Sequence, residues 1–188
     1  MTRSMMTLCG VLLGAAGLLV GCGQTASTPA PVAKAPAPKI DGTKFVLAEE
    51  PADAKTVDEV REAAKDGDEI VIVGRIGGDR DPWVADRAAF LIVDPSRIPC
   101  SERTGDSCKT PWDYCCETDL AKSKATIKFV DEAGKTLGVD ARQLLIASNL
   151  KELQTVVVKG QAKRDEAGNL TVLASGLFVR PASETKPE

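Results

Sequence analysis

A run of β-branched residues, Glu69–Ile76, sets the strongest limit on what this chain can fold into. Its sequence EIVIVGRI favours a strand, and Gly74 within it indicates a bulge or a close backbone approach. Directly before it, Thr56 and Glu59 form a capping box, which predicts a short helix that Gly67 ends. We therefore expect the folded part of the chain to begin with a helix followed by a strand.

Four further segments have the composition of strands, because they are rich in apolar β-formers and turn sequences separate them. They lie at residues 88–93, 125–130, 153–162 and 170–180. Asp140 and Gln143 form a second capping box, which predicts a helix over residues 141–147. Residues 94–123 show no periodic apolar pattern, so we expect a long loop between the second and third strands. The predicted order is α-β-β-β-α-β-β.

This order resembles the OB-fold, a mainly β five-stranded barrel with a helix between its third and fourth strands. The resemblance covers residues 56–180 and is carried by TVDEV at 56–60, DGDEIVIVGRI at 66–76, VVVKG at 156–160 and NLTVL at 169–173. These pieces are similar to exported bacterial OB-fold domains, in which a short helix precedes a strand ending in Gly-x-Ile. A different small barrel and an open five-stranded α+β sheet are the alternatives.

The N-terminal segment has the features of an export signal: Arg3 is its only charge, and an apolar run follows at residues 8–20 that is too short to span a bilayer. Leu19, Val20 and Gly21 followed by Cys22 resemble the lipobox of bacterial lipoproteins. That resemblance implies cleavage before Cys22 and a covalent diacylglyceryl group on its thiol. A plain secretory signal and a short transmembrane anchor are the alternatives.

The composition divides the chain into four parts: a signal peptide at 1–21, a Pro/Ala-rich linker at 22–54, a barrel domain at 55–181 and a tail at 182–188. A linker of this composition cannot bury a core, so we expect it to be a disordered tether. The protein is then exported and anchored to a membrane of the cell envelope through the lipid on Cys22, and no other cofactor is expected. In bacterial lipoproteins, an aspartate directly after the acylated cysteine favours retention in the inner membrane. Here that position is occupied by Gly23, so the resemblance favours the outer membrane.

The predicted long loop contains all the cysteines that follow Cys22, namely Cys100, Cys108, Cys115 and Cys116. In an oxidising compartment, four cysteines in such a loop indicate two disulfides. A bond between adjacent Cys115 and Cys116 would close a strained ring, so the favoured pairings join Cys100 and Cys108 to this vicinal pair, in either order.

The same four cysteines allow other chemistry, namely a zinc or iron–sulfur site or thiol–disulfide exchange. The gaps between them, seven, six and no residues, differ from the closely spaced cysteine pairs of zinc ribbons. The chain has no histidine, which excludes imidazole-based metal sites and histidine-activated nucleophiles. No catalytic motif is present, so the sequence favours a binding or interaction module over an enzyme.

Two groups of residues are candidates for recognition. Within the loop they are Trp112, Asp113 and Tyr114, although the two aromatic residues could instead pack onto the barrel or the sulfurs. On the predicted strands they are Arg75, Lys124, Lys128 and Lys159, because OB-folds bind ligands on a strand face. A net charge of −3 and the lack of a Lys/Arg tract disfavour nucleic acid. We expect an envelope protein or a small polar ligand, with an oligonucleotide or oligosaccharide as the weaker alternative.

Overall fold

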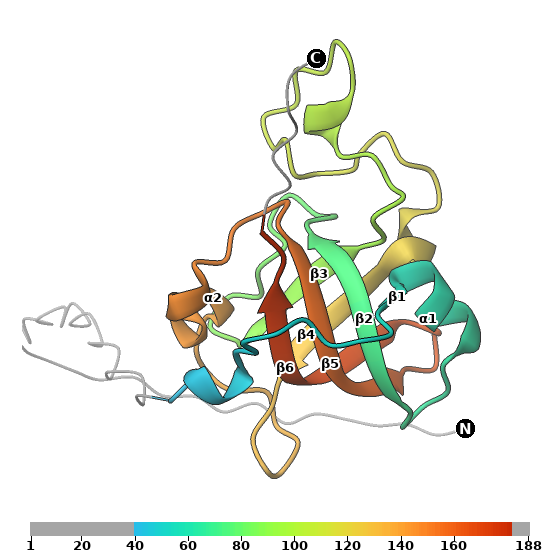
Figure 1. Ribbon diagram of the computed structural model, residues 1–188. Coiled ribbons are helices and arrows are strands. Elements are labelled where there is room, and N and C mark those ends of the chain that lie inside the picture. The colour runs from blue at the N-terminus through green and yellow to red at the C-terminus, as the bar shows by residue number, and fades with distance from the viewer. Residues whose placement is uncertain (1–39, 182–188) are drawn as a thin grey trace, which may run out of the picture. The chain divides into compact units, whose positions relative to one another are not determined.

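The computed structural model describes residues 40–181. The predicted signal peptide, Cys22, most of the linker and the tail lie outside the described residues. Within residues 40–181, no helix has the length and apolar character needed to cross a membrane. The strands are β1 Lys55–Thr56, β2 Glu69–Ile76, β3 Ala89–Val93, β4 Lys124–Phe129, β5 Thr155–Arg164 and β6 Leu170–Val179 (Figure 1). The helices are α1 Val57–Ala63 and α2 Ala141–Leu144, and the 3-10 turns are η1 Thr43–Phe45, η2 Cys100–Glu102, η3 Leu120–Ser123 and η4 Ile146–Ser148.

Five of the strands close into a barrel. Strand β2 pairs antiparallel with both β3 and β5, and β5 pairs antiparallel with β6. Strand β4 pairs antiparallel with β3 and parallel with β6, so the order β2-β3-β4-β6-β5 returns to β2. This strand order, with α2 between β4 and β5, is that of the OB-fold. The predicted fold class is confirmed, and the open-sheet alternative is wrong because β2 and β5 pair.

Alternation along the strands fills the barrel with apolar side chains. In β4 the inward residues are Ala125, Ile127 and Phe129, each at most 2% exposed, while Lys124, Thr126 and Lys128 face outward. The centre is aromatic: the Phe129 ring lies 4.9 Å from the Phe45 ring and 6.4 Å from the Phe90 ring, centroid to centroid. Phe90 and Phe129 are both 0% exposed, which places them in the core.

Two glycines allow strands to approach closely. A Cβ at Gly74 would stand 2.9 Å from Ile92 Cδ1, so the close approach predicted there is confirmed. The register shift lies elsewhere, between Lys159 and Gly160 of β5. A Cβ at Gly160 would stand 2.3 Å from the carbonyl oxygen of Leu173, so only glycine fits at this irregularity.

The capping sequences predicted the first helix more accurately than the second. Thr56 Oγ1 accepts a hydrogen bond from the Glu59 backbone N–H at 3.3 Å, and Glu59 Oε2 accepts one from the Thr56 N–H at 2.7 Å, so the first capping box is confirmed. Asp140 instead accepts from the Arg142 N–H at 2.8 Å. Helix α2 is shorter than predicted and continues only as η4, because Leu145 leaves the helical backbone conformation and is itself buried.

The packed domain extends N-terminal to residue 55, the boundary predicted from composition. Phe45 is 6% exposed and belongs to the core. Beyond it the chain crosses the barrel (Figure 1), where the Leu47 backbone N–H donates to the Leu177 carbonyl at 2.8 Å. Glu50 then pairs with Arg180 at 2.6 Å. Residues 40–54 therefore cover the barrel beside β6.

Replacing Phe45 with alanine tests whether this segment belongs to the domain. Loss of a buried ring against Phe129 should lower the free energy of unfolding by about 3 kcal/mol. Val46→Ala, at a side chain that is 37% exposed, should cost about 0.5 kcal/mol and is the matched control. Chemical denaturation followed by circular dichroism measures both. Equal stability of Phe45→Ala and wild type would show that the segment does not stabilise the barrel.

Candidate functional site

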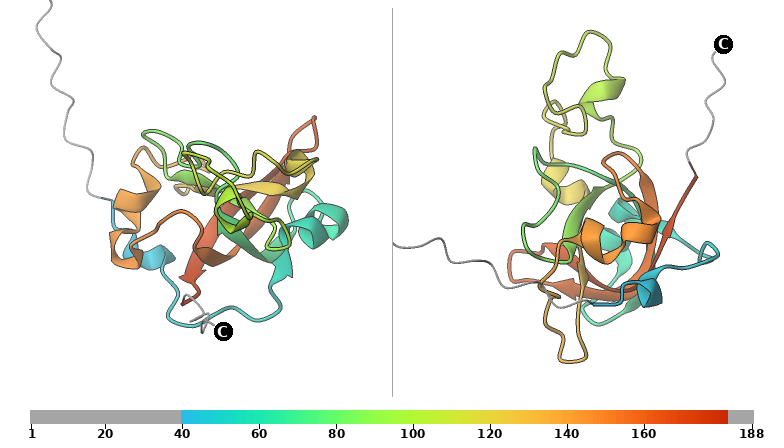
Figure 2. Two further views of the ribbon diagram at one scale, coloured as in Figure 1. Left: turned by 90° about the horizontal axis from the view of Figure 1, so that it is seen from above. Right: turned by 90° about the vertical axis from the view of Figure 1, so that its left-hand side faces the viewer.

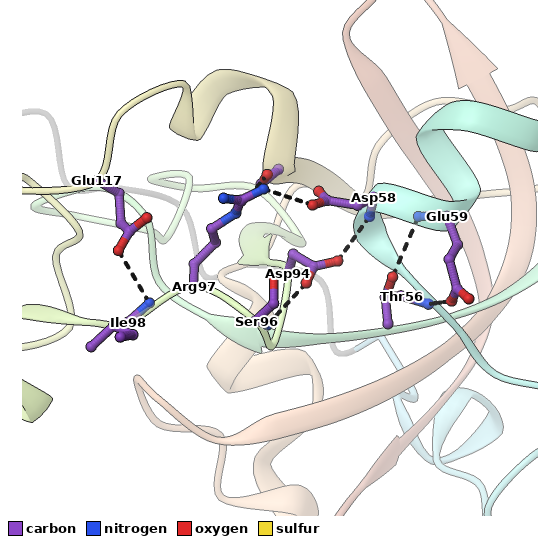
Figure 3. A network of polar contacts seen from close by, with 9 residues as sticks. Thr56, Asp58, Glu59, Asp94, Ser96, Arg97, Ile98 and Glu117 are labelled. Atoms are coloured by element: carbon purple, nitrogen blue, oxygen red, sulfur yellow. Dashed lines mark hydrogen bonds and ion pairs between the residues drawn. The ribbon is translucent and has the colours of Figure 1, made fainter.

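The long loop between β3 and β4, residues 94–123, is named the cysteine loop, and it leaves the barrel at a buried carboxylate. Asp94 is 2% exposed. Its Oδ2 accepts a hydrogen bond from the Asp58 backbone N–H at 2.8 Å, in the first turn of α1, and its Oδ1 accepts from the Ser96 N–H at 2.9 Å (Figure 3). Burial raises the pKa of Asp94, but these hydrogen bonds outweigh burial and hold it below its usual value. Asp94 is thus ionised and joins the loop to α1.

Arg97 holds the two ends of the cysteine loop together. Its Nη2 donates to Asp58 Oδ2 at 2.8 Å, and its Nε donates to Ser123 Oγ at 2.9 Å. The backbone N–H of Asp94 also donates to the Ser123 carbonyl at 2.9 Å, and Ser123 is 1% exposed. The base of the loop is therefore closed by both backbone and side-chain contacts.

Two aromatic residues dock the middle of the cysteine loop onto the loop that follows β2. Tyr114 is 1% exposed, and a Cβ at Gly77 would stand 3.1 Å from Tyr114 Cε2 and 2.7 Å from the Trp112 carbonyl oxygen. Trp112 Nε1 donates to the Arg80 carbonyl at 3.1 Å, and the Trp112 carbonyl accepts from the Gly78 N–H at 3.3 Å. Tyr114 therefore takes the packing role considered for it, and Trp112 is half-buried in the same contact.

Charged residues complete this docking. Arg75, a candidate for the ligand face, instead donates from Nη2 to Glu102 Oε1 at 2.7 Å and so ties β2 to the cysteine loop. Burial lowers the pKa of Arg75, but the hydrogen bond to Glu102 outweighs it and leaves the pKa raised. Asp113, a candidate for recognition, is half-buried, and its Oδ1 accepts from the Tyr114 N–H at 2.7 Å. These side chains position the loop.

Three of the four thiols converge. The backbone N–H groups of Cys100 and Ser101 donate to the carbonyls of Asp113 and Pro111 at 2.9 and 3.0 Å, which folds the loop back on itself. The Sγ atoms of Cys100, Cys108 and Cys115 consequently all lie within 4.8 Å of one another, a group that we name the thiol cluster.

The predicted disulfides are not formed in this structure, where Cys100, Cys108, Cys115 and Cys116 are free thiols. The Sγ atoms of Cys100 and Cys115 are 3.3 Å apart, beyond the roughly 2.05 Å of a disulfide bond. Cys116 is exposed, and its Sγ lies 3.9 Å from that of Cys115. Of the vicinal pair, Cys115 joins the thiol cluster.

The three clustered thiols have different acidities. Burial raises the pKa of Cys100. Hydrogen bonding to Thr110, whose hydroxyl is 3.4 Å from the sulfur, lowers the pKa of Cys108. The neighbouring thiols of Cys100 and Cys116 raise the pKa of Cys115 to about 12. Cys108 is therefore the thiol of the cluster that loses its proton most readily.

The remaining basic candidates lie in two places. Lys124 and Lys128 line one groove of about 410 Å³ with Arg61 and Asn169, while Lys159 lines a separate hollow with Lys55 and Glu69. Lys124 Nζ donates to the Gly78 carbonyl at 3.1 Å, a second link to the loop after β2. Phe90 and Phe129 are in the core and cannot stack on bases in either hollow. The third strand phenylalanine, Phe178 on β6, is half-buried and lines neither hollow.

An open hollow of about 550 Å³ lies on the outer part of the cysteine loop. Its apolar wall is Ile98, 47% exposed, whose backbone N–H faces Glu117 Oε1 at 3.4 Å. Arg103 forms an ion pair with Glu117 and also lines the hollow. The other lining residues are Glu102, Thr104, Gly105, Asp106, Ser107 and Cys116.

Sequence reasoning missed several of the residues that shape this site. Asp94 directly follows the strand predicted at residues 88–93, and Arg97 and Ile98 lie in a segment without periodicity. The one available signal for Ile98 was an isolated large apolar residue among polar ones. Nothing in the sequence around Gly77 indicated that Tyr114 would pack against it.

No family model and no curated protein matches this chain, but several solved structures do. The OBody AM1L10 bound to hen egg-white lysozyme is 10% identical, over 73% of this chain and 100% of its own, with a TM-score of 0.42. The telomere capping protein Ten1 from Saccharomyces pombe is 14% identical, over 72% and 86%, with a TM-score of 0.34. A DUF3299 family protein from Pseudomonas aeruginosa PAO1 is 14% identical, over 77% and 96%, with a TM-score of 0.32. The OB assignment rests on the strand order and pairing of this barrel.

Tyr114, the only tyrosine of the chain, provides a direct test of the docking. Burial raises its pKa to about 12, and its hydroxyl has no hydrogen-bond partner among residues 40–181. Between about pH 10 and 12 the unfolded chain loses the phenol proton while the folded chain keeps it, so stability should fall as pH rises through this window. Absorbance titration of the phenolate should give a midpoint near 12.

Tyr114→Phe should abolish this alkaline loss and fold at least as stably at neutral pH, because it removes an unpartnered buried hydroxyl. Tyr114→Ala should lower the free energy of unfolding by about 3 kcal/mol. The free energy of unfolding of both variants is measured by denaturation at neutral pH and at a pH between the unfolded and folded pKa values of Tyr114. A midpoint near 10 would mean that Tyr114 is exposed to water.

Proposed function

We propose that this chain is a lipid-anchored, extracytoplasmic binding module, whose OB barrel presents the cysteine loop as a contact surface for a protein of the cell envelope. One observation carries the proposal: the loop is fixed at its base and flank, while its outer hollow is open to solvent. In Figures 1 and 2 the loop projects from one end of the barrel, opposite the turn between β4 and α2.

Fixation of the loop favours recognition for an energetic reason. Binding costs the freedom of every segment that becomes ordered in the complex, so a loop that is already ordered loses less. Asp94 and Arg97 close the base, and Tyr114 holds the middle. Loops held by a rigid scaffold are also where binding residues concentrate.

The hollow has the chemistry of a protein contact. Ile98 supplies an exposed apolar wall, and Glu102 and the Arg103–Glu117 ion pair supply polar groups beside it. Interfaces between proteins combine these two features. The acidic balance of the chain and the burial of Phe90 and Phe129 favour a protein over a nucleic acid as partner.

The anchor is tested by Cys22→Ser, which removes the thiol that the lipobox resemblance assigns to lipid attachment. The variant should move from the membrane fraction to the soluble fraction, and the mature wild type should carry diacylglycerol on its first residue by mass spectrometry. Cys9→Ser, within the predicted signal peptide, should stay lipidated and is the control. A Cys22→Ser variant that is still cleaved before residue 22 and still bound to membranes would contradict the proposal.

The contact surface is tested with two exposed isoleucines at different places on the molecule. Ile98→Glu should abolish capture of the envelope partner by the anchored protein in crosslinked membranes, with an unchanged melting temperature. Ile146→Glu, at a side chain on η4 that is 77% exposed, should capture the same partner as wild type. Loss of capture by the Ile146 variant alone would place the contact surface away from the cysteine loop.

A further inference from the structure

The thiol cluster brings together sulfur atoms from three separate parts of the cysteine loop. Cys100 begins η2, Cys108 lies six residues after η2 ends at Glu102, and Cys115 follows the docked Tyr114. Local structure does not create this group. It forms because the backbone pairing of Cys100 with Asp113 folds the loop back on itself, at 2.9 Å.

The spacing of the sulfur atoms matches that of ligands around one metal ion. Thiolates bound to zinc at about 2.3 Å in a tetrahedron stand about 3.8 Å apart. In the thiol cluster the Sγ atoms of Cys100 and Cys115 are 3.3 Å apart, and all three pairs lie within 4.8 Å. The separation of Cys100 and Cys115 is about 0.5 Å below the tetrahedral value, and no pair can exceed it by more than about 1 Å, so small shifts of the side chains suffice to place three sulfurs on one ion.

Among the described residues, the ligand atoms that lie within 4.8 Å of one another in this group are all sulfur, and the nearby carboxylates have hydrogen-bond or ion-pair partners of their own. Asp106 Oδ1 accepts from the Cys108 N–H at 2.6 Å, and Asp113 Oδ1 accepts from the Tyr114 N–H at 2.7 Å. Glu117 pairs with Arg103. Soft thiolate ligands select zinc and monovalent copper over magnesium and calcium, which prefer oxygen.

We propose that Cys100, Cys108 and Cys115 bind one zinc ion as three thiolates, with the fourth coordination position open. Each thiol gives up its proton on binding, so the dication and three thiolates leave the site with one negative charge. The Thr110 hydroxyl, 3.4 Å from Cys108 Sγ, lies beside one ligand and orients it by donating a hydrogen bond to the sulfur.

Convergence distinguishes this arrangement from two disulfides. Two disulfides require the four thiols to separate into two pairs. Cys108 instead lies within 4.8 Å of both Cys100 and Cys115, and Cys116 is the thiol left out of the group. The sequence spacing that differs from zinc ribbons does not oppose the site, because folding of the loop, rather than a short cysteine pair, brings the ligands together.

The test uses the full mature protein, purified from membranes without reductant or chelator. Elemental analysis should give one zinc per chain, and native mass spectrometry should show the same ion with reduced thiols. Copper in place of zinc would support a thiolate site but overturn the choice of metal. Two disulfides without metal would overturn the proposal.

Variants identify the ligands. Co²⁺ serves as a probe in the reduced, metal-free protein, because thiolate coordination gives it an intense charge-transfer absorption. The zinc affinity of each variant is measured by competition with Co²⁺. Cys108→Ser should lower this affinity by more than about 100-fold, and Thr110→Val, which removes a neighbour of a ligand, should lower it by about 10-fold. Cys116→Ser is the matched control and should bind zinc as wild type does.

Loss of zinc binding in Cys116→Ser with retention in Cys108→Ser would overturn the assignment of ligands. Unchanged zinc affinity in Thr110→Val, whose thiols are all intact, would overturn the orienting role of Thr110. The outcome does not depend on the proposed partner, because partner capture and metal content are measured separately.

Discussion

The buried carboxylate of Asp94 is the interaction on which the functional part of this molecule depends. A loop of about thirty residues in a compact domain is uncommon, and its closure costs conformational entropy. Asp94 offsets this cost at the base, where it accepts hydrogen bonds from α1 and from its own loop. With Arg97 bridging Asp58 and Ser123, the cysteine loop starts and ends at one fixed place on the barrel.

A fixed base gives the rest of the loop a defined path, and the path decides which groups meet. Tyr114 reaches the space that Gly77 leaves open, and the carbonyl of the preceding residue pairs with Cys100. Cys115 follows at once and therefore lies beside Cys100. The recognition proposed at the outer hollow and the coordination proposed at the thiol cluster would draw on the same preorganisation, since each benefits from a loop that is ordered before its ligand arrives.

The charges on the barrel serve this same arrangement. In many OB-folds, basic residues on the strands contact a ligand directly. Here Arg75 holds Glu102 of the cysteine loop, and Lys124 holds the carbonyl of Gly78. Phe90 and Phe129 on the strands belong to the core, and Phe178 on β6 is half-buried. Arg75 and Lys124 thus hold loops, whereas Lys128 and Lys159 line separate hollows.

Local patterns in the sequence predicted most of the barrel. The β-branched run at Glu69–Ile76 and the capping box before it appear as β2 and α1, because both depend on backbone preferences within a few residues. The shorter α2, the burial of Tyr114 and the choice of Cys115 over Cys116 were decided by tertiary structure. Each depends on which distant segments meet once β2 pairs with β5 and the barrel closes, and no pattern of neighbouring residues encodes such long-range contacts.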